Sequence, residues 1–194
     1  MNKEKAIAYI LDRLGKGLSS DLKYHSLGHS LEVIRSTKFL ASKEGVSETD
    51  LSLLETAAAY HDSGFLLSHD DHEEVGCEIV QKELPAFGYS QEQIESIKGM
   101  IMATQIPQAP ETQLEKIICD GDLKYLGGER YFELAEKLYE ELKLTGYHLS
   151  SEKWLDLQID FLEGHRYWTD YAKDVLSPNK ILVLNRLKSQ KLAN

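Results

Sequence analysis

Apolar residues recur along most of the chain at spacings of three and four, which is the period of an amphipathic helix. Leu51, Leu54 and Ala58 follow a capping-box pattern in this way, and the next position of their stripe is His61. No run alternates between β-branched and polar residues as a strand would. Only four prolines occur in 194 residues. The pattern therefore predicts an all-α fold of nine or ten helices.

Capping and turn signals indicate where these helices begin and end. A second capping pattern begins at Ser90, and the segment 106–111 contains two prolines and is expected to be a loop. The run 131–144 predicts a strong helix, and Ser150 is expected to begin the next one. Ser177 precedes a proline and is expected to be the N-cap of the last helix. No linker or internal repeat divides the chain, so residues 1–194 are expected to form a single domain.

Two His-Asp pairs differ in their surroundings. His61-Asp62 is expected to occupy the last turn of an apolar helix, because Gly64 stands where the C-cap glycine of that helix is expected. The pair is therefore expected to be at least partly buried, and a buried charge is paired or binds a metal. His69-Asp70 lies in a polar run and is expected to be exposed.

Composition limits the classes of partner. The formal net charge of −10 disfavours a nucleic-acid polymer, which needs a basic face. No window is long and apolar enough to span a membrane, and the N-terminus has a helix pattern and not that of a signal peptide. Cys77 and Cys119 are expected to be reduced core thiols, so we expect a cytoplasmic protein.

Further polar residues with metal-binding chemistry lie on both sides of the His61-Asp62 pair. His25 and His29 are four residues apart at the start of an expected helix. Downstream, Asp120 and Asp122 are separated by about 200° around a helix axis, so only one is expected to face a given site. Asp122 follows the buried side of its helix and is the better candidate, whereas Asp120 is expected to be solvated or a supporting carboxylate. Gly121 between them suggests a close approach to the backbone.

The order His29, His61-Asp62 and Asp122 resembles the signature H…HD…D of the HD superfamily of helical, metal-dependent phosphohydrolases. The segment YHSLGH is similar to a family segment in which asparagine is usual at the position of Ser26. DGDLKYLG and the C-terminal FLEGHRYWTDYA resemble segments of a bacterial subgroup. The resemblance covers residues 20–190. It implies an HD-type, phosphodiesterase-like helical bundle, with a core over about 20–130 and C-terminal helices 131–194 packed on it.

The resemblance also implies a site. His29, His61, Asp62 and Asp122 would be ligands of one divalent metal ion, and Mn²⁺, Mg²⁺, Fe²⁺, Ni²⁺ and Zn²⁺ all suit two imidazoles and two carboxylates. Such an ion lowers the pKa of a bound water, which then attacks phosphorus. As a ligand of that ion, Asp62 is expected to be a catalytic residue as well. His25 matches a histidine that protonates the leaving oxygen in related phosphodiesterases, and its alternative is a structural role at the start of the helix.

Other residues have weaker signals. His72 and Lys124 are candidate substrate contacts, as is Arg130, although each is also typical of an exposed surface. His165 is expected to be structural. Thr104 and Gln105 stand where a further ligand could lie, which favours one metal over two and argues against a di-iron oxygenase.

The expected function is hydrolysis of a small phosphate ester or nucleotide. The alternative is an HD-type regulatory protein that binds a nucleotide or another ligand without hydrolysing it. An oxygenase is a third and weaker alternative. The expected partner is a small phosphorylated substrate, and a homodimer is left open.

Overall fold

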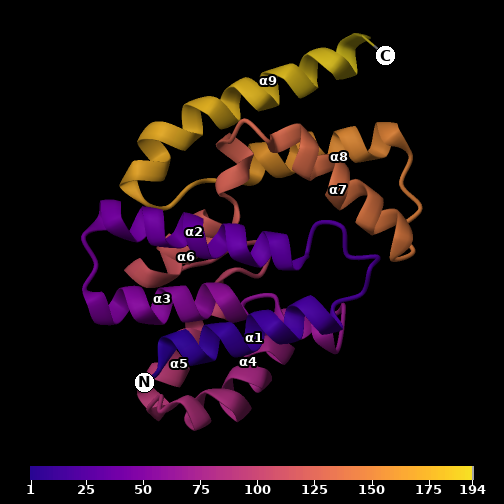
Figure 1. Cartoon of the computed structure of the whole chain (residues 1–194). Helices are drawn as coiled ribbons and strands as arrows, with labels where there is room; N and C mark the ends of the chain where they lie inside the picture. The colour runs from indigo at the N-terminus through magenta and orange to yellow at the C-terminus, as the bar shows by residue number, and fades with distance from the viewer. Residues whose placement is uncertain (194) are drawn as a thin grey trace.

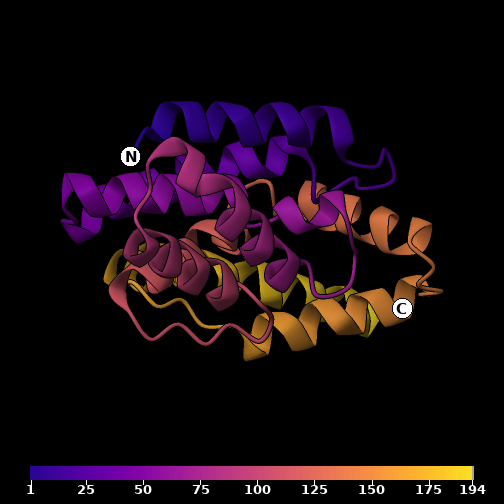
Figure 2. The ribbon, with the colours of Figure 1, turned by 90° about the horizontal axis from the view of Figure 1, so that it is seen from below.

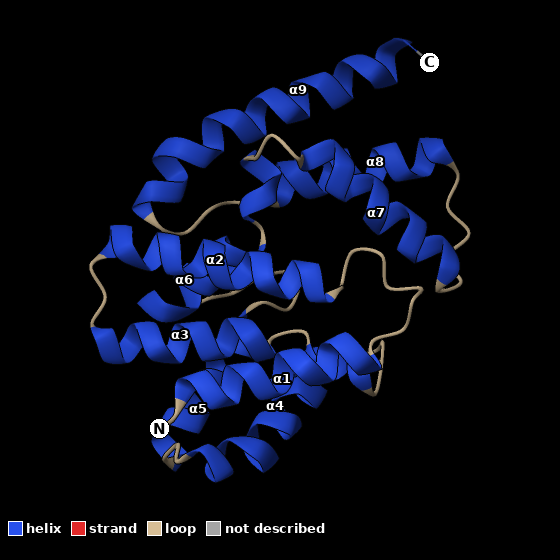
Figure 3. Ribbon diagram, viewed as in Figure 1, coloured by secondary structure: helices blue, strands red, loops and turns tan. Residues whose placement is uncertain are grey.

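The computed structural model describes residues 1–193, and over these residues the chain folds into helices joined by loops, without strands (Figure 3). The expected all-α fold is confirmed. The α-helices are α1 (Lys3–Gly17), α2 (Leu27–Glu44), α3 (Glu48–Tyr60), α4 (His72–Glu83), α5 (Gln91–Ala103), α6 (Gln113–Asp122), α7 (Tyr131–Leu144), α8 (Ser151–Gly164) and α9 (Ser177–Ala193).

Three helices begin at the caps that the sequence indicates, Ser47, Ser90 and Ser150. The Ser47 side chain accepts a hydrogen bond from the Asp50 backbone at the start of α3. Ser90 and Gln93 form a reciprocal capping box at the start of α5, and Ser150 caps α8. Each such cap satisfies backbone N–H groups that have no partner inside the helix.

Two expected helix boundaries are wrong. Gly64 is not a left-handed C-cap: α3 ends at Tyr60, and Gly64 lies in the short 3₁₀-helix Ser63–Leu66 (η1). A Cβ at Gly64 would stand 1.9 Å from the backbone oxygen of His72, so close packing of α4 requires this glycine. Ser177 is not an N-cap either, because a π-helical turn, Ala172–Leu176 (η4), runs directly into α9.

The cap of this last helical stretch lies further back. The Thr169 hydroxyl accepts a hydrogen bond from the Ala172 backbone N–H at 3.3 Å. Pro178 follows the π-helical turn, where the backbone hydrogen bonds already depart from α-helical spacing. The proline therefore marks an irregular turn inside a helix and not a helix start.

Helices α1 to α6 surround one hydrophobic cluster, in which α2 packs against both α3 and α6. The cluster includes Ala6, Ile10 and Leu14 of α1, so the core extends further toward the N-terminus than residue 20. A second cluster is formed by residues from Leu123 to Leu187. Figure 1 shows α7, α8 and α9 on one side of the layer formed by α2 and α6, and α1, α4 and α5 on the other. The view turned by 90° also shows α1 and the C-terminal helices on opposite sides of the molecule (Figure 2).

Both cysteines are buried free thiols, as expected. None of the described helices combines the length and the apolar character that a membrane crossing requires.

Candidate metal centre

Three separate segments bring the four signature residues together. His29 lies in the first turn of α2, His61-Asp62 directly follows α3, and Asp122 is the last residue of α6. Because α2 packs on both α3 and α6, the ends of these helices meet. His29 Nε2 lies 3.3 Å from His61 Nε2, 3.1 Å from Asp122 Oδ1 and 3.4 Å from Asp62 Oδ2. The side chains that the sequence singled out thus converge on one point.

The donor atoms of this cluster fit a divalent cation. His61 Nδ1 lies 2.9 Å from the backbone oxygen of Ala58 and donates to it, which leaves Nε2 with a free lone pair. Among the described residues, the buried Asp62 Oδ2 has no hydrogen-bond partner, and it lies 3.1 Å from His61 Nε2 and 3.4 Å from His29 Nε2. Ligand atoms of His29, His61 and Asp122 lie within 4.8 Å of one another. A buried carboxylate oxygen without a donor, facing two imidazole nitrogens, is the arrangement that a bound cation completes.

Charge at the cluster is balanced by protons when no metal is present. Burial opposes protonation of His61, but the negative charges of Asp62 and Asp122 outweigh it and raise the pKa of His61 to about 9. Burial likewise opposes ionisation of Asp62, but His61 outweighs it and lowers the pKa of Asp62. A metal ligand must be deprotonated, so an incoming cation replaces the proton on His61.

His25 lies beside this cluster and is held by a residue far away in the sequence. Its backbone N–H donates to Glu141 Oε2 at 3.0 Å, and its Nδ1 contacts Glu141 Oε1. Glu141 belongs to α7 and is buried. Burial would lower the pKa of His25, but the hydrogen bond to Glu141 and the charge of Asp62 outweigh it and raise the pKa. The structure thus keeps His25 protonated at a higher pH than an ordinary histidine.

Phe65 connects His25 to His72. The Phe65 ring stacks against each histidine ring, with its centroid 4.5 Å from that of His25 and 4.1 Å from that of His72, and the two histidine rings are tilted relative to each other at 6.1 Å. His72 Nε2 lies 3.7 Å from Asp62 Oδ1. Burial lowers the pKa of His72. His72 therefore lies at the edge of the centre as a neutral side chain, whereas His69 is exposed, as expected.

The two basic candidates lie on another side of the cluster. Lys124 Nζ lies 5.5 Å from the ring centroid of Phe39, and its side chain borders a hollow that is also lined by His29 and Asp122. Arg130 is exposed and pairs with Glu133. Their roles as substrate contacts stay predictions.

The expectation that Asp120 is exposed to solvent is wrong. Its side chain is completely buried, on the side of α6 opposite to Asp122, because the C-terminal segment covers that side. It accepts hydrogen bonds from the backbone N–H groups of Trp168 and Thr169 and from the Thr169 hydroxyl, at 2.7 to 3.1 Å. Burial raises the pKa of Asp120 to about 6. Asp120 is thus a structural carboxylate.

The expected close approach at Gly121 is confirmed. A Cβ at this position would lie 2.3 Å from Thr37 Oγ1 and 3.1 Å from Thr37 Cα, on α2. The glycine therefore lets α6 approach α2 closely enough for Asp122 to reach His29.

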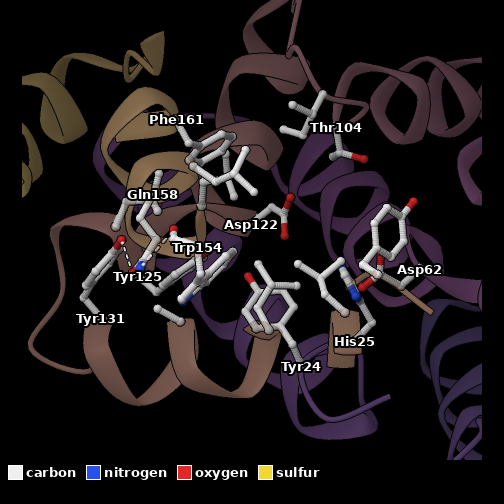
Figure 4. A pocket seen from close by; sticks show the side chains of 18 of the residues that line it. Tyr24, His25, Asp62, Thr104, Asp122, Tyr125, Tyr131, Trp154, Gln158 and Phe161 are labelled. Atoms are coloured by element: carbon white, nitrogen blue, oxygen red, sulfur yellow. Dashed lines mark hydrogen bonds between the residues drawn. The ribbon is translucent and has the colours of Figure 1, made fainter. Parts of the chain in front are cut away.

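A cavity of about 830 Å³ adjoins the cluster and extends toward α7 and α8. Figure 4 shows His25 and Asp62 at one end, Tyr131 and Gln158 at the other, and Asp122 between them. Thr104 and Gln105 border the cavity, so the position where a further ligand could stand does face the site.

Sequence reasoning did not identify Glu141 or Phe65. Glu141 follows another glutamate on an amphipathic helix, and no local signal separates the two. Phe65 is three residues after Asp62, and its place between two histidines depends on how η1 turns back toward α4. The apolar residues of α7 and α8 that line the cavity have the ordinary pattern of an amphipathic helix.

Comparisons with known proteins agree with this geometry. Two solved structures share the fold: a protein described as a "predicted HD superfamily hydrolase" from an uncultured Thermotogales bacterium, and a protein from Lactobacillus plantarum. The first has a TM-score of 0.62 at 19% identity, over 94% of this chain and 89% of that one. The second has a TM-score of 0.69 at 16% identity, over the full length of both. No curated protein matches the chain.

The model of the HD domain family matches residues 26–124. This range contains the four residues that converge on one point, His29, His61, Asp62 and Asp122. By this match over half of its length, and by the site that the same residues build, the chain belongs to the HD domain family.

Proposed function

We propose that the chain is a metal-dependent phosphohydrolase that acts on a small phosphate ester or a nucleotide. The observation that carries the proposal is the convergence of His29, His61, Asp62 and Asp122 beside a cavity large enough for a substrate. Membership of the HD family supports it.

His29, His61, Asp62 and Asp122 would hold one divalent ion. When bound, such an ion supplies an activated water and offsets negative charge at phosphorus. Asp62 is the central ligand carboxylate, because its orphaned oxygen is the group of this cluster that most needs a cation.

Other side chains near the metal centre bind the substrate or assist the reaction. His25 protonates the leaving oxygen, and Glu141 orients its ring by accepting a hydrogen bond from Nδ1, so that Nε2 is left for the substrate. His72 offers a hydrogen bond to the phosphate from the edge of the centre. Lys124 supports binding from the neighbouring hollow.

The proposal is tested by metal content and phosphate release together. Protein purified without chelator is expected to contain about one divalent ion per chain. Asp62→Ala and His61→Ala should lose the ion and the hydrolysis of phosphate esters, measured after addition of each of the five candidate metals in turn.

Asp70→Ala is the matched control, because Asp70 belongs to the exposed His-Asp pair. This variant should keep both the metal and the activity. Ligand-induced thermal stabilisation without turnover of any ester or nucleotide would contradict the hydrolase proposal and favour a regulatory binding protein.

A further inference from the structure

The cavity beside the metal centre is much larger than a phosphate group requires. Its volume of about 830 Å³ is within the range of about 300–1,000 Å³ that is typical of sites for small organic molecules. It begins at His25, Asp62 and Asp122 and continues between α7 and α8 (Figure 4). A substrate with its phosphate at the metal centre would therefore place its other part in this cavity.

The end of the cavity away from the metal centre is apolar. Aromatic rings and leucines form its walls, among them Tyr131, Leu138, Leu142, Trp154 and Phe161. Two of the polar side chains at this end, those of Tyr131 and Gln158, already have partners within the protein. Tyr131 Oη donates to Gln158 Oε1 at 3.1 Å, and Gln158 Nε2 donates to the Trp154 backbone oxygen at 3.4 Å. This end favours hydrocarbon over a sugar or a base that needs several hydrogen bonds.

The charges of the cavity walls also argue against a chain of phosphates. Among the described residues, those that line it include no lysine or arginine. Its charged side chains are His25, beside the metal centre, and the carboxylates Asp62, Glu73, Asp122 and Asp160. One phosphate at the metal centre would be neutralised there. A second or third phosphate deeper in the cavity would lie beyond His25, among apolar side chains and the carboxylate of Asp160.

The neighbouring hollow, of about 540 Å³, is the other place where phosphates could lie. Most of its cations are already paired. Arg35 binds Glu32 at 2.7 Å, and Arg130 and Lys137 both bind Glu133, at 2.8 and 2.9 Å. A nucleotide polyphosphate would have to compete with these carboxylates.

Building on the proposed function, we infer that the preferred substrate is a phosphate monoester of an apolar alcohol, whose hydrocarbon part occupies the cavity. In hydrolysis, the oxygen of water forms a bond to phosphorus and the bond from phosphorus to the alcohol oxygen breaks. The alcohol oxygen takes a proton from His25, and a proton from the attacking water restores the imidazolium. The products are the free alcohol and inorganic phosphate.

Binding of phosphonates separates this inference from catalysis, because their carbon–phosphorus bond is not hydrolysed. Calorimetry on the metal-loaded protein would compare decylphosphonate, below its micelle-forming concentration, with methylphosphonate and a methylene-bridged ATP analogue. We expect decylphosphonate to bind at least tenfold more tightly than either of the others.

Two substitutions on α7 locate the bound chain. Leu138→Trp fills the cavity and should weaken decylphosphonate binding at least tenfold while methylphosphonate binding is unchanged. Leu134→Trp, one turn earlier, faces the basic hollow and should alter neither. Leu138→Phe is the smaller substitution to use if the tryptophan variant fails to fold.

Equal binding of the two phosphonates, or unchanged decylphosphonate binding in the Leu138 variants, would overturn the inference. Tighter binding of the ATP analogue would overturn it in favour of a nucleotide in the basic hollow. If decylphosphonate binds as expected but neither decyl phosphate nor methyl phosphate releases phosphate, the hydrolase proposal fails and the assignment of the cavity stands.

Discussion

The carboxylate of Glu141 organises the residues around His25. It accepts hydrogen bonds from the backbone N–H groups of Tyr24 and His25, at 2.7 and 3.0 Å, and it contacts the His25 ring. Burial raises the pKa of Glu141, but its bonds to His25 outweigh this effect and lower it. The pair is therefore ionic between the low pKa of Glu141 and the raised pKa of His25.

Glu141→Gln is expected to lower kcat roughly 10- to 100-fold, because an amide keeps the shape of the side chain but not the charge that holds His25 protonated. A general acid works while it is protonated, so activity falls as the pH rises through the pKa of His25. The variant lowers that pKa, and the loss of activity should begin at a lower pH. The pH profile of kcat measures this shift.

Glu140→Gln is the matched control for this prediction, because Glu140 is the exposed neighbour of Glu141 on the same helix. Its pH profile should be that of the unchanged protein. An unshifted profile in Glu141→Gln, with kcat reduced, would assign Glu141 to structure alone. Stability gives a second measurement. Because the pKa of His25 is raised in the folded state, the His25–Glu141 pair should stop stabilising the fold as the pH rises through that pKa.

At the level of helices, the contact between α2 and α6 sets the distance between two metal ligands. His29 lies near the start of α2 and Asp122 at the end of α6, and Gly121 lies against Thr37 of α2. Because the obstruction at Gly121 includes the backbone Cα of Thr37, rotation of one side chain cannot relieve it. Metal geometry therefore depends on the absence of a Cβ at residue 121.

Gly121→Ala is expected to reduce the free energy of unfolding by about 1–3 kcal/mol, as overpacking does in cores, and to weaken metal binding. Urea denaturation and metal titration measure the two effects. Thr37→Ala removes the nearest obstructing atom and should restore part of both losses in the double variant.

Gly164→Ala is the matched control for this contact. A Cβ at Gly164, the last residue of α8, would meet no atom of the described residues within 4 Å. Its stability should stay equal or rise slightly, since alanine restricts the unfolded chain. Equal stability of the Gly121 and Gly164 variants would contradict the role of close packing between α2 and α6.

At the level of the whole molecule, the features that could be predicted from the sequence are those that local sequence patterns determine. Caps at Ser47, Ser90 and Ser150 depend on neighbouring residues, and the ligand set follows the order of a known signature. Glu141 contacts a residue 117 positions away, so its role depends on how two distant helices dock. The same holds for Asp120, whose burial comes from a segment that follows it by nearly fifty residues.

Asp120 links α6 to the segment in which the C-terminal helical stretch begins. Asp120→Ala would leave the buried donors of Trp168 and Thr169 without an acceptor, at a cost of roughly 2–4 kcal/mol. Because these donors belong to the segment next to η4 and α9, we expect hydrogen exchange to increase around 165–172 while α3 and α5 stay protected.

Asp122→Asn is the matched control for this prediction, because Asp122 lies only two residues after Asp120 on the same helix. Asp122 faces the metal ligands, so its variant should lose metal and leave exchange at 165–172 unchanged. Equal loss of protection across all helices in Asp120→Ala would show that the two hydrophobic clusters unfold as one unit. Loss confined to 165–172 would show that a buried carboxylate, and not apolar packing alone, holds the C-terminal helices against the half of the molecule that carries the metal ligands.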